Sequence, residues 1–157
     1  MVESANILGV PSAAASHVVG VLENHASKLT LGHVTTIPHV LDVIRDDLED
    51  ARWRVSTGPR SKGGVLVGRT PRRDVLAEAV HPDGAVLWIE LGRAWTNFGF
   101  LHHAIEAAMV PAATDVILAV RQRWETQYTY DRCRDYLLDL RESGLPLPYE
   151  SLTIVGF

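Results

Sequence analysis

Residues 72–97 read RRDVLAEAVHPDGAVLWIELGRAWTN, and this stretch decides the predicted fold because it contains two strands joined by a tight turn. The turn is HPDG, residues 81–84. Its proline presets φ at the first central position, its aspartate suits the second, and its glycine accepts a positive φ. Three-residue hairpin loops are commonly built this way, which places His81 opposite Ala85.

The register of this hairpin predicts that two carboxylates lie together. Leu76 falls opposite Glu90 and Asp74 opposite Gly92, and alternate residues of a strand share a face. Asp74 and Glu90 are then diagonal neighbours, about 7–8 Å apart at the backbone. Two carboxylates at that separation can bind one divalent cation. Glu78 shares their face but lies about 13 Å along the strand from Asp74, so we expect it to have a packing or surface role.

The composition is that of an ordinary globular chain. With 157 residues, 46% of them hydrophobic, the chain can bury a core without disulfides. The sole cysteine, Cys133, excludes an internal disulfide and a cysteine-based zinc site, and its helical spacing predicts a core position. No apolar run is long enough for a transmembrane helix, and the N-terminus lacks the basic region of a signal peptide. We therefore expect a cytoplasmic protein with no membrane partner.

The net charge of −4 hides a local asymmetry. Between positions 51 and 73 every charged residue is basic, namely Arg52, Arg54, Arg60, Lys62, Arg69, Arg72 and Arg73. A phosphate backbone responds to the local sign of charge, so this segment is a candidate contact for DNA. A solvated loop explains the same segment equally well.

Apolar spacing predicts an alternation of helices and strands. Helices are expected over residues 12–29, about 38–51, 97–110 and 129–142. Strands are expected near 53–55, 73–80, 85–91, 116–120 and 152–157, with a fragment at 65–67 and a loop at 57–64.

The order of these elements predicts an α/β fold. Strand, helix and strand between residues 85 and 120 form a parallel crossover, which follows an antiparallel hairpin. We therefore predict a three-layer α/β/α core with a mixed sheet. A single domain would span residues 1–157, with an N-terminal helical extension at 1–35 and the core at 36–157.

This arrangement resembles the core of the PD-(D/E)XK nuclease superfamily, the restriction-endonuclease-like fold. The matching residues are Arg73-Asp74-Val75 for the first acid and Trp88-Ile89-Glu90-Leu91-Gly92 for the second motif, and the resemblance covers about residues 37–120. It implies that Asp74 and Glu90 are catalytic and bind Mg²⁺ or Mn²⁺ for hydrolysis of DNA phosphodiester bonds. It further suggests a homodimer, so that two sites can act on two strands.

The residues that we expect to contact DNA phosphates are basic and lie around the two acids: Arg69, Arg72, Arg73 and Arg93. Such contacts make the affinity for DNA strongly dependent on salt.

The second motif departs from the family pattern of an acid, a spacer and a lysine. If Glu90 is the acid, the lysine position is Gly92; if Glu90 stands at the lysine position, the acid position is Trp88. Two functions therefore stay open: a small metal-dependent endonuclease of the restriction type, and a catalytically degenerate relative that binds DNA or a partner protein without cutting. An unrelated small α/β binding protein is a third.

The seven histidines include no pair at the spacing of a helical metal motif. His102 and His103 are adjacent, and adjacent residues of a helix point in different directions. We therefore expect no metal site at these histidines.

Overall fold

The computed structural model describes residues 1–29, 36–92 and 94–157. The strands are β1 (Glu3–Leu8), β2 (Arg54–Val55), β3 (Val65–Arg69), β4 (Asp74–Ala77), β5 (Ala79–Val80), β6 (Ala85–Glu90), β7 (Asp115–Val120) and β8 (Ser151–Gly156). The helices are α1 (Ala13–Asn24), α2 (Ala26–Leu29), α3 (Ile37–Asp50), α4 (Arg60–Gly63), α5 (Gly99–Ala108) and α6 (Thr129–Glu142).

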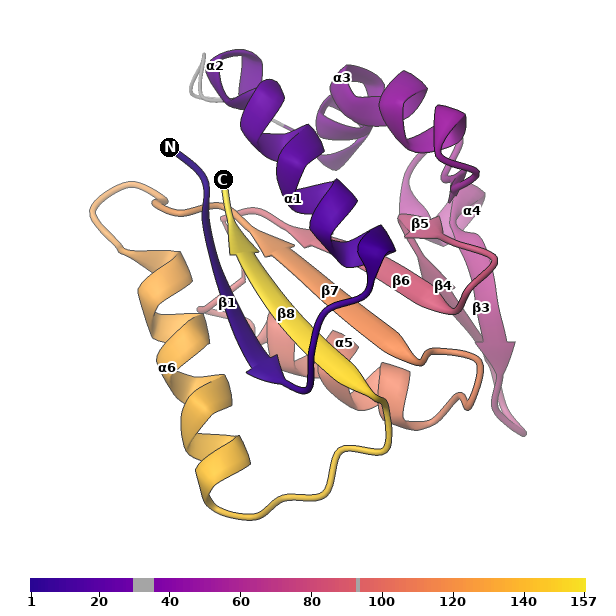
Figure 1. Ribbon diagram of the computed structural model, residues 1–157, viewed down its shortest axis with the longest axis vertical. Coiled ribbons are helices and arrows are strands. Elements are labelled where there is room, and N and C mark those ends of the chain that lie inside the picture. The colour runs from indigo at the N-terminus through magenta and orange to yellow at the C-terminus, as the bar shows by residue number, and fades with distance from the viewer. Residues whose placement is uncertain (30–35, 93) are drawn as a thin grey trace.

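Six of the strands form one mixed sheet in the order β1-β8-β7-β6-β5-β2 (Figure 1). Strands β6, β7 and β8 are parallel and are connected through α5 and α6, whereas β1 and β5 are antiparallel to their neighbours. The predicted parallel pairing of the strands near 85–91 and 116–120 is confirmed, with Trp88 opposite Leu118. The central position of β7 explains its uninterrupted apolar sequence, since both of its faces are buried.

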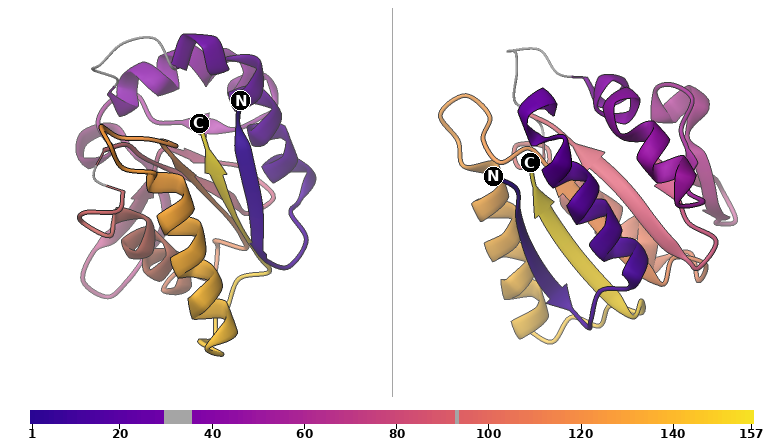
Figure 2. Two further views of the ribbon diagram at one scale, coloured as in Figure 1. Left: turned by 90° about the vertical axis from the view of Figure 1, so that its left-hand side faces the viewer. Right: turned by 45° about the horizontal axis from the view of Figure 1, so that its top comes forward.

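Helices cover both faces of this sheet, so the molecule has three layers (Figures 1 and 2). On one face, Leu22 of α1 and Ile44 of α3 pack in a core with Ile117 of β7. On the opposite face, Phe100 of α5 packs in a second core with Leu118 of β7. The predicted α/β fold with a mixed sheet between helices is therefore confirmed.

Capping residues in the sequence fix the N-terminal starts of α1 and α3. The hydroxyl of Ser12 accepts a hydrogen bond from the backbone N–H of Ala15 at 3.1 Å, at the start of α1. The hydroxyl of Thr36 accepts one from His39 at 3.3 Å, at the start of α3. Within α6, Cys133 is buried, as its spacing predicts.

The N-terminal region belongs to the sheet and its core. Residues 3–8, which we did not predict as a strand, form β1 and pair with β8, with Glu3 opposite Gly156. Helix α1 buries Leu22 in the core that it shares with β7. The prediction of a helical segment at 1–35 is therefore wrong for residues 3–8, whereas 13–24 and 26–29 are helical as predicted and 30–35 lie outside the described residues. The expected loop at 57–64 contains the short helix α4.

The predicted turn at residues 81–84 is confirmed, together with the register beside it. The backbone N–H of His81 donates to the carbonyl of Ala85 at 2.9 Å, and Gly84 has a positive φ of 91°. Ala79 lies opposite Leu87, as the turn requires.

The extension of that register to Asp74 is wrong. The chain leaves β6 at Glu78, and β4 pairs instead with β3 in a separate two-stranded ribbon, where Asp74 lies opposite Arg69. The physical cause is the Glu78 side chain, whose Oε2 accepts the backbone N–H of Ile89 at 2.9 Å. In a continued ladder that N–H would pair with the backbone of Ala77. The carboxylate replaces the next ladder bond, so the strand is free to diverge.

None of the helices in the described ranges has the length and apolar character needed to cross a bilayer.

Replacing Ile117 by alanine tests the burial of β7. Ile117 is fully buried, at 0% exposure, whereas Ile105 on α5 is 52% exposed. The buried substitution leaves a cavity, so we expect the free energy of unfolding to fall by about 2–5 kcal/mol. The same change at Ile105 should alter it by less than about 0.5 kcal/mol. Urea denaturation measures both values, and equal effects at the two positions would contradict the described sheet.

Candidate functional site

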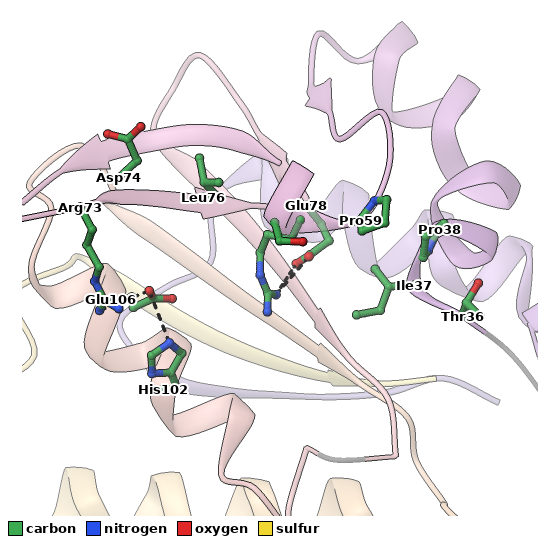
Figure 3. A pocket seen from close by; sticks show the side chains of 12 residues that line it. Thr36, Ile37, Pro38, Pro59, Arg73, Asp74, Leu76, Glu78, His102 and Glu106 are labelled. Carbon is green, nitrogen blue, oxygen red and sulfur yellow. Dashed lines mark hydrogen bonds and ion pairs between the residues drawn. The ribbon is translucent and has the colours of Figure 1, made fainter. Parts of the chain in front are cut away.

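A cleft of about 830 Å³ opens between α3, α4, the β3–β4 ribbon and α5 (Figure 3). Apolar lining comes from Ile37, Pro38, Pro59 and Leu76. The ionisable residues that line it are Arg60, Arg73, Asp74, Glu78, His102 and Glu106. This combination of a concave surface with several converging charges makes the cleft the candidate site.

Two carboxylates meet around one guanidinium at the inner end of the cleft. Arg60 Nη1 lies 3.0 Å from Glu78 Oε1, and Arg60 Nη2 lies 3.7 Å from Glu90 Oε1. The side chain of Glu78 is 1% exposed and that of Glu90 is 16% exposed, while Arg60 is 29% exposed. A positive group therefore stands between two largely buried acids.

Short-range contacts hold Arg60 in this place. The buried hydroxyl of Ser56 donates to the carbonyl of Gly58 at 2.7 Å and lies 2.9 Å from that of Gly63, which closes the loop that contains α4. Arg45 of α3 donates to the Ser56 carbonyl at 2.8 Å. The start of α4 is thus tied to α3, although α4 is only four residues long.

The chain of charges continues from Glu90 into α5. His103 Nε2 lies 2.6 Å from Glu90 Oε1, and His103 Nδ1 lies 3.2 Å from Glu106 Oε2. The imidazole is 1% exposed and stacks on the Trp88 indole, with ring centroids 5.5 Å apart and planes 7° from parallel. Both ring nitrogens therefore face carboxylates, and the orientation of the ring is fixed.

The approach of α5 to Glu90 depends on a glycine. A Cβ atom on Gly99 would lie 2.8 Å from the carboxylate carbon of Glu90. A side chain at this position would force either the Glu90 carboxylate or the first turn of α5 to shift. The N-terminus of a helix favours negative charge, so the close approach also stabilises the Glu90 carboxylate.

At the outer end of the cleft, Glu106 contacts the exposed side chains of a histidine and an arginine (Figure 3). Its Oε1 lies 3.4 Å from His102 Nε2 and 3.4 Å from Arg73 Nη2. Arg73 comes from the turn of the β3–β4 ribbon and is 50% exposed. The ionic network therefore runs from buried Glu78 to the solvent.

The pKa of one of the three acids is raised in this network, and the pKa values of the other two are lowered. Burial raises the pKa of Glu78 above its usual value, against the opposing charge of Arg60. Burial acts in the same direction on Glu90 and Glu106 and is the largest single effect, but the hydrogen bond with His103 and the nearby positive charges together outweigh it and lower both pKa values. For His103 itself, burial opposes the charged form, yet the hydrogen bonds with Glu106 and Glu90 raise its pKa.

The structure does not bring the two predicted catalytic acids into contact. Asp74 forms an ion pair with Arg69 at 2.9 Å, and its side chain is 51% exposed. Figure 3 shows Asp74 pointing away from Glu106. Within the described part of the chain, no hydrogen bond or ion pair joins Asp74 to Glu90. The acid beside Glu90 is Glu78, which we had expected to have a packing or surface role.

The predicted basic residues fall in two groups. Arg69, Arg72 and Arg73 are exposed on the β3–β4 ribbon, and of the three Arg73 lines the cleft. Arg93 lies outside the described residues.

The two histidines of α5 form a group with Glu106 that the spacing of histidines alone does not indicate. His102, His103 and Glu106 place one ligand atom each within 4.8 Å of one another, close enough for a shared metal ion. The sequence contains a signal for this group, because Glu106 is four residues after His102 and three after His103. Residues at both separations are neighbours on a helix.

The sequence matches no protein family model and no curated protein.

The pKa shifts predict how stability depends on pH. Folding raises the pKa of His103 above its usual 6.5, so its stabilising contribution is complete below pH 6.5 and is lost as the pH rises through the folded-state pKa. The lowered pKa values of Glu90 and Glu106 give a contribution that is present above pH 4.5 and is lost as the pH falls through their folded-state values.

We therefore expect the Tm of the chelator-treated protein to fall as the pH is raised above 6.5, the usual pKa of histidine. His103→Gln should lower the Tm and flatten that part of the profile, since the amide does not titrate. Differential scanning calorimetry across the pH range measures both slopes. Parallel profiles for the two proteins would show that His103 is not the group responsible.

Proposed function

We propose that the protein hydrolyses phosphodiester bonds of DNA with a divalent cation, Mg²⁺ or Mn²⁺, held by Glu78 and Glu90. The observation that carries this proposal is the position of the Arg60 guanidinium, which contacts both carboxylates at the inner end of the cleft. A site that holds one cationic group between two acids has the donor set of a hard divalent cation. The proposal keeps Glu90 from the sequence-based prediction and replaces Asp74 by Glu78.

The neighbouring side chains support this role. Glu90 is oriented by His103, since Nε2 of the imidazole lies 2.6 Å from Oε1 of the acid. Glu78 is oriented by the N–H of Ile89, which lies 2.9 Å from its Oε2. Partners of this kind fix the direction in which a carboxylate presents its free oxygen. A bound divalent cation would polarise the phosphodiester group and activate a water molecule.

The arginines supply the contacts with phosphate. Arg60 must leave the two carboxylates before a cation binds there, and it would then remain in the cleft as a guanidinium that can bind phosphate oxygens. Arg69, Arg72 and Arg73 are exposed on the β3–β4 ribbon and would contact the backbone of the same DNA. Two such clefts in a homodimer would serve the two strands.

A plasmid assay with matched variants tests the choice of acids. We expect cutting in Mg²⁺ or Mn²⁺ that is lost in chelator. Glu78→Gln and Glu90→Gln should each reduce the rate by at least about 100-fold, because loss of a metal ligand costs at least as much as loss of its outer partner. Asp74→Asn, which changes an exposed acid paired with Arg69, should stay within about threefold of the parent rate.

The opposite pattern, with activity lost in Asp74→Asn and retained in Glu78→Gln, would return the site to Asp74 and Glu90. Absence of cutting by the parent protein in either metal would contradict hydrolysis altogether.

The second candidate function, binding of DNA without hydrolysis, is favoured by Trp88. This residue occupies the acid position of the family motif when Glu90 is aligned with the lysine. Its indole is fully buried, and Nε1 donates to the Leu76 carbonyl at 2.9 Å, so the position supplies no ligand. Salt-sensitive binding of duplex DNA without cutting, weakened by Arg72→Ala but not by Arg123→Ala, would support this alternative.

A further inference from the structure

Helix α5 carries a second group of ligands whose chemistry differs from that of the two acids. His102 and His103 are followed by Glu106 at the four- and three-residue separations that place side chains on neighbouring positions of a helix. All three come from one helix, so no rearrangement of the fold is needed to bring them together. One ligand atom from each lies within 4.8 Å of the other two.

The separations of the two imidazoles from the Glu106 carboxylate fit a small tetrahedral ion. Bonds from zinc to nitrogen and oxygen are about 2.0–2.1 Å, so two ligand atoms at neighbouring corners of a tetrahedron are about 3.3 Å apart. His103 Nδ1 lies 3.2 Å from Glu106 Oε2, and His102 Nε2 lies 3.4 Å from Glu106 Oε1. The side chain of His102 is 55% exposed, so it can turn to complete the set.

The surroundings of His103 are those of a metal ligand. A histidine that binds metal through one ring nitrogen commonly donates the other N–H to a carboxylate, which fixes the tautomer and the ring direction. His103 Nε2 lies 2.6 Å from Glu90 Oε1, which leaves Nδ1 directed at Glu106. The stack on Trp88 holds the plane of the ring, at 7° to the indole.

We propose that His102 Nε2, His103 Nδ1 and the Glu106 carboxylate bind a zinc-class divalent cation with an open fourth position. Two imidazoles and one carboxylate select such an ion over Mg²⁺, which requires oxygen ligands in near-octahedral geometry. Because His102 and Glu106 line the cleft, the open position is accessible from it. This site does not depend on the proposed hydrolysis, whose cation binds to Glu78 and Glu90.

In the metal-free protein, the guanidinium of Arg73 contacts one of the proposed ligands. Arg73 Nη2 lies 3.4 Å from Glu106 Oε1, the oxygen that faces His102. Arg73 is half-exposed in the turn before β4, so it can move away when the metal binds. Its removal should therefore strengthen binding, which a merely structural role of Glu106 would not predict.

Isothermal titration of the metal-free protein with Zn²⁺ at neutral pH tests the proposal. We expect one Zn²⁺ per chain, retained in a large excess of Mg²⁺. His102→Ala and Glu106→Gln should each weaken binding by at least about tenfold. Arg73→Ala should tighten it by about twofold to fivefold, the effect of removing an exposed ion pair. His17→Ala on α1 changes an exposed histidine outside the cleft and should leave the affinity unchanged.

Circular dichroism confirms that each variant folds, and His102→Ala, which alters an exposed side chain, remains informative if Glu106→Gln does not fold. The absorption of the Co²⁺-loaded protein gives an independent readout of tetrahedral coordination. Failure of the parent protein to bind Zn²⁺, or equal affinity in the parent and His102→Ala, would overturn the site. Neither result depends on whether the protein cuts plasmid DNA.

Discussion

A single buried carboxylate, that of Glu78, determines where β4 leaves β6 and where the cleft begins. An unpaired charge at this depth would cost several kcal/mol, so the acid needs partners that replace water. Ile89 provides one through its backbone N–H at 2.9 Å, and Arg60 provides the other at 3.0 Å. The first bond takes the place of a ladder hydrogen bond, and the second brings the first residue of α4 to the acid. The divergence of β4 from β6 follows from both.

The remaining ion pairs connect Glu78 to other charged residues of the cleft. Arg60 also contacts Glu90, and Glu90 contacts His103, which in turn contacts Glu106. Each acid has a cationic neighbour, so the cleft concentrates ionisable groups without leaving a buried charge unpaired. A metal ion could bind in such a network only by displacing a resident cationic side chain. For this reason both proposed cation sites include a named arginine that must move.

Local and periodic signals predicted much of the fold. The turn at residues 81–84, the parallel crossover from 85 to 120 and the helix at 129–142 depend on neighbours in sequence, and the structure contains all three. β1 was missed because ESANIL, residues 3–8, lies at an edge of the sheet and has no strict apolar alternation.

The site could be predicted only in part, because its geometry depends on long-range pairing. Glu90 was identified, but its partner acid was not, since the rule of alternating faces fails where a side chain replaces a ladder bond. Nothing near Arg60 in sequence shows that its guanidinium meets an acid 18 residues away. The grouping of His102, His103 and Glu106 on α5 is not indicated by the spacing of histidines alone, because the third member is an acid.

The central role of Glu78 requires energetic coupling between Arg60 and Glu78, which a double-mutant cycle measures directly. The cycle compares the unfolding free energies of the parent protein, Arg60→Leu, Glu78→Gln and the double variant. Glutamine keeps an acceptor for the Ile89 N–H, so the cycle isolates the ion pair. We predict a stabilising coupling of at least about 1 kcal/mol, within the range for residues that share an ion-pair network. A coupling below about 0.5 kcal/mol, the level found for independent sites, would contradict the central role of this pair.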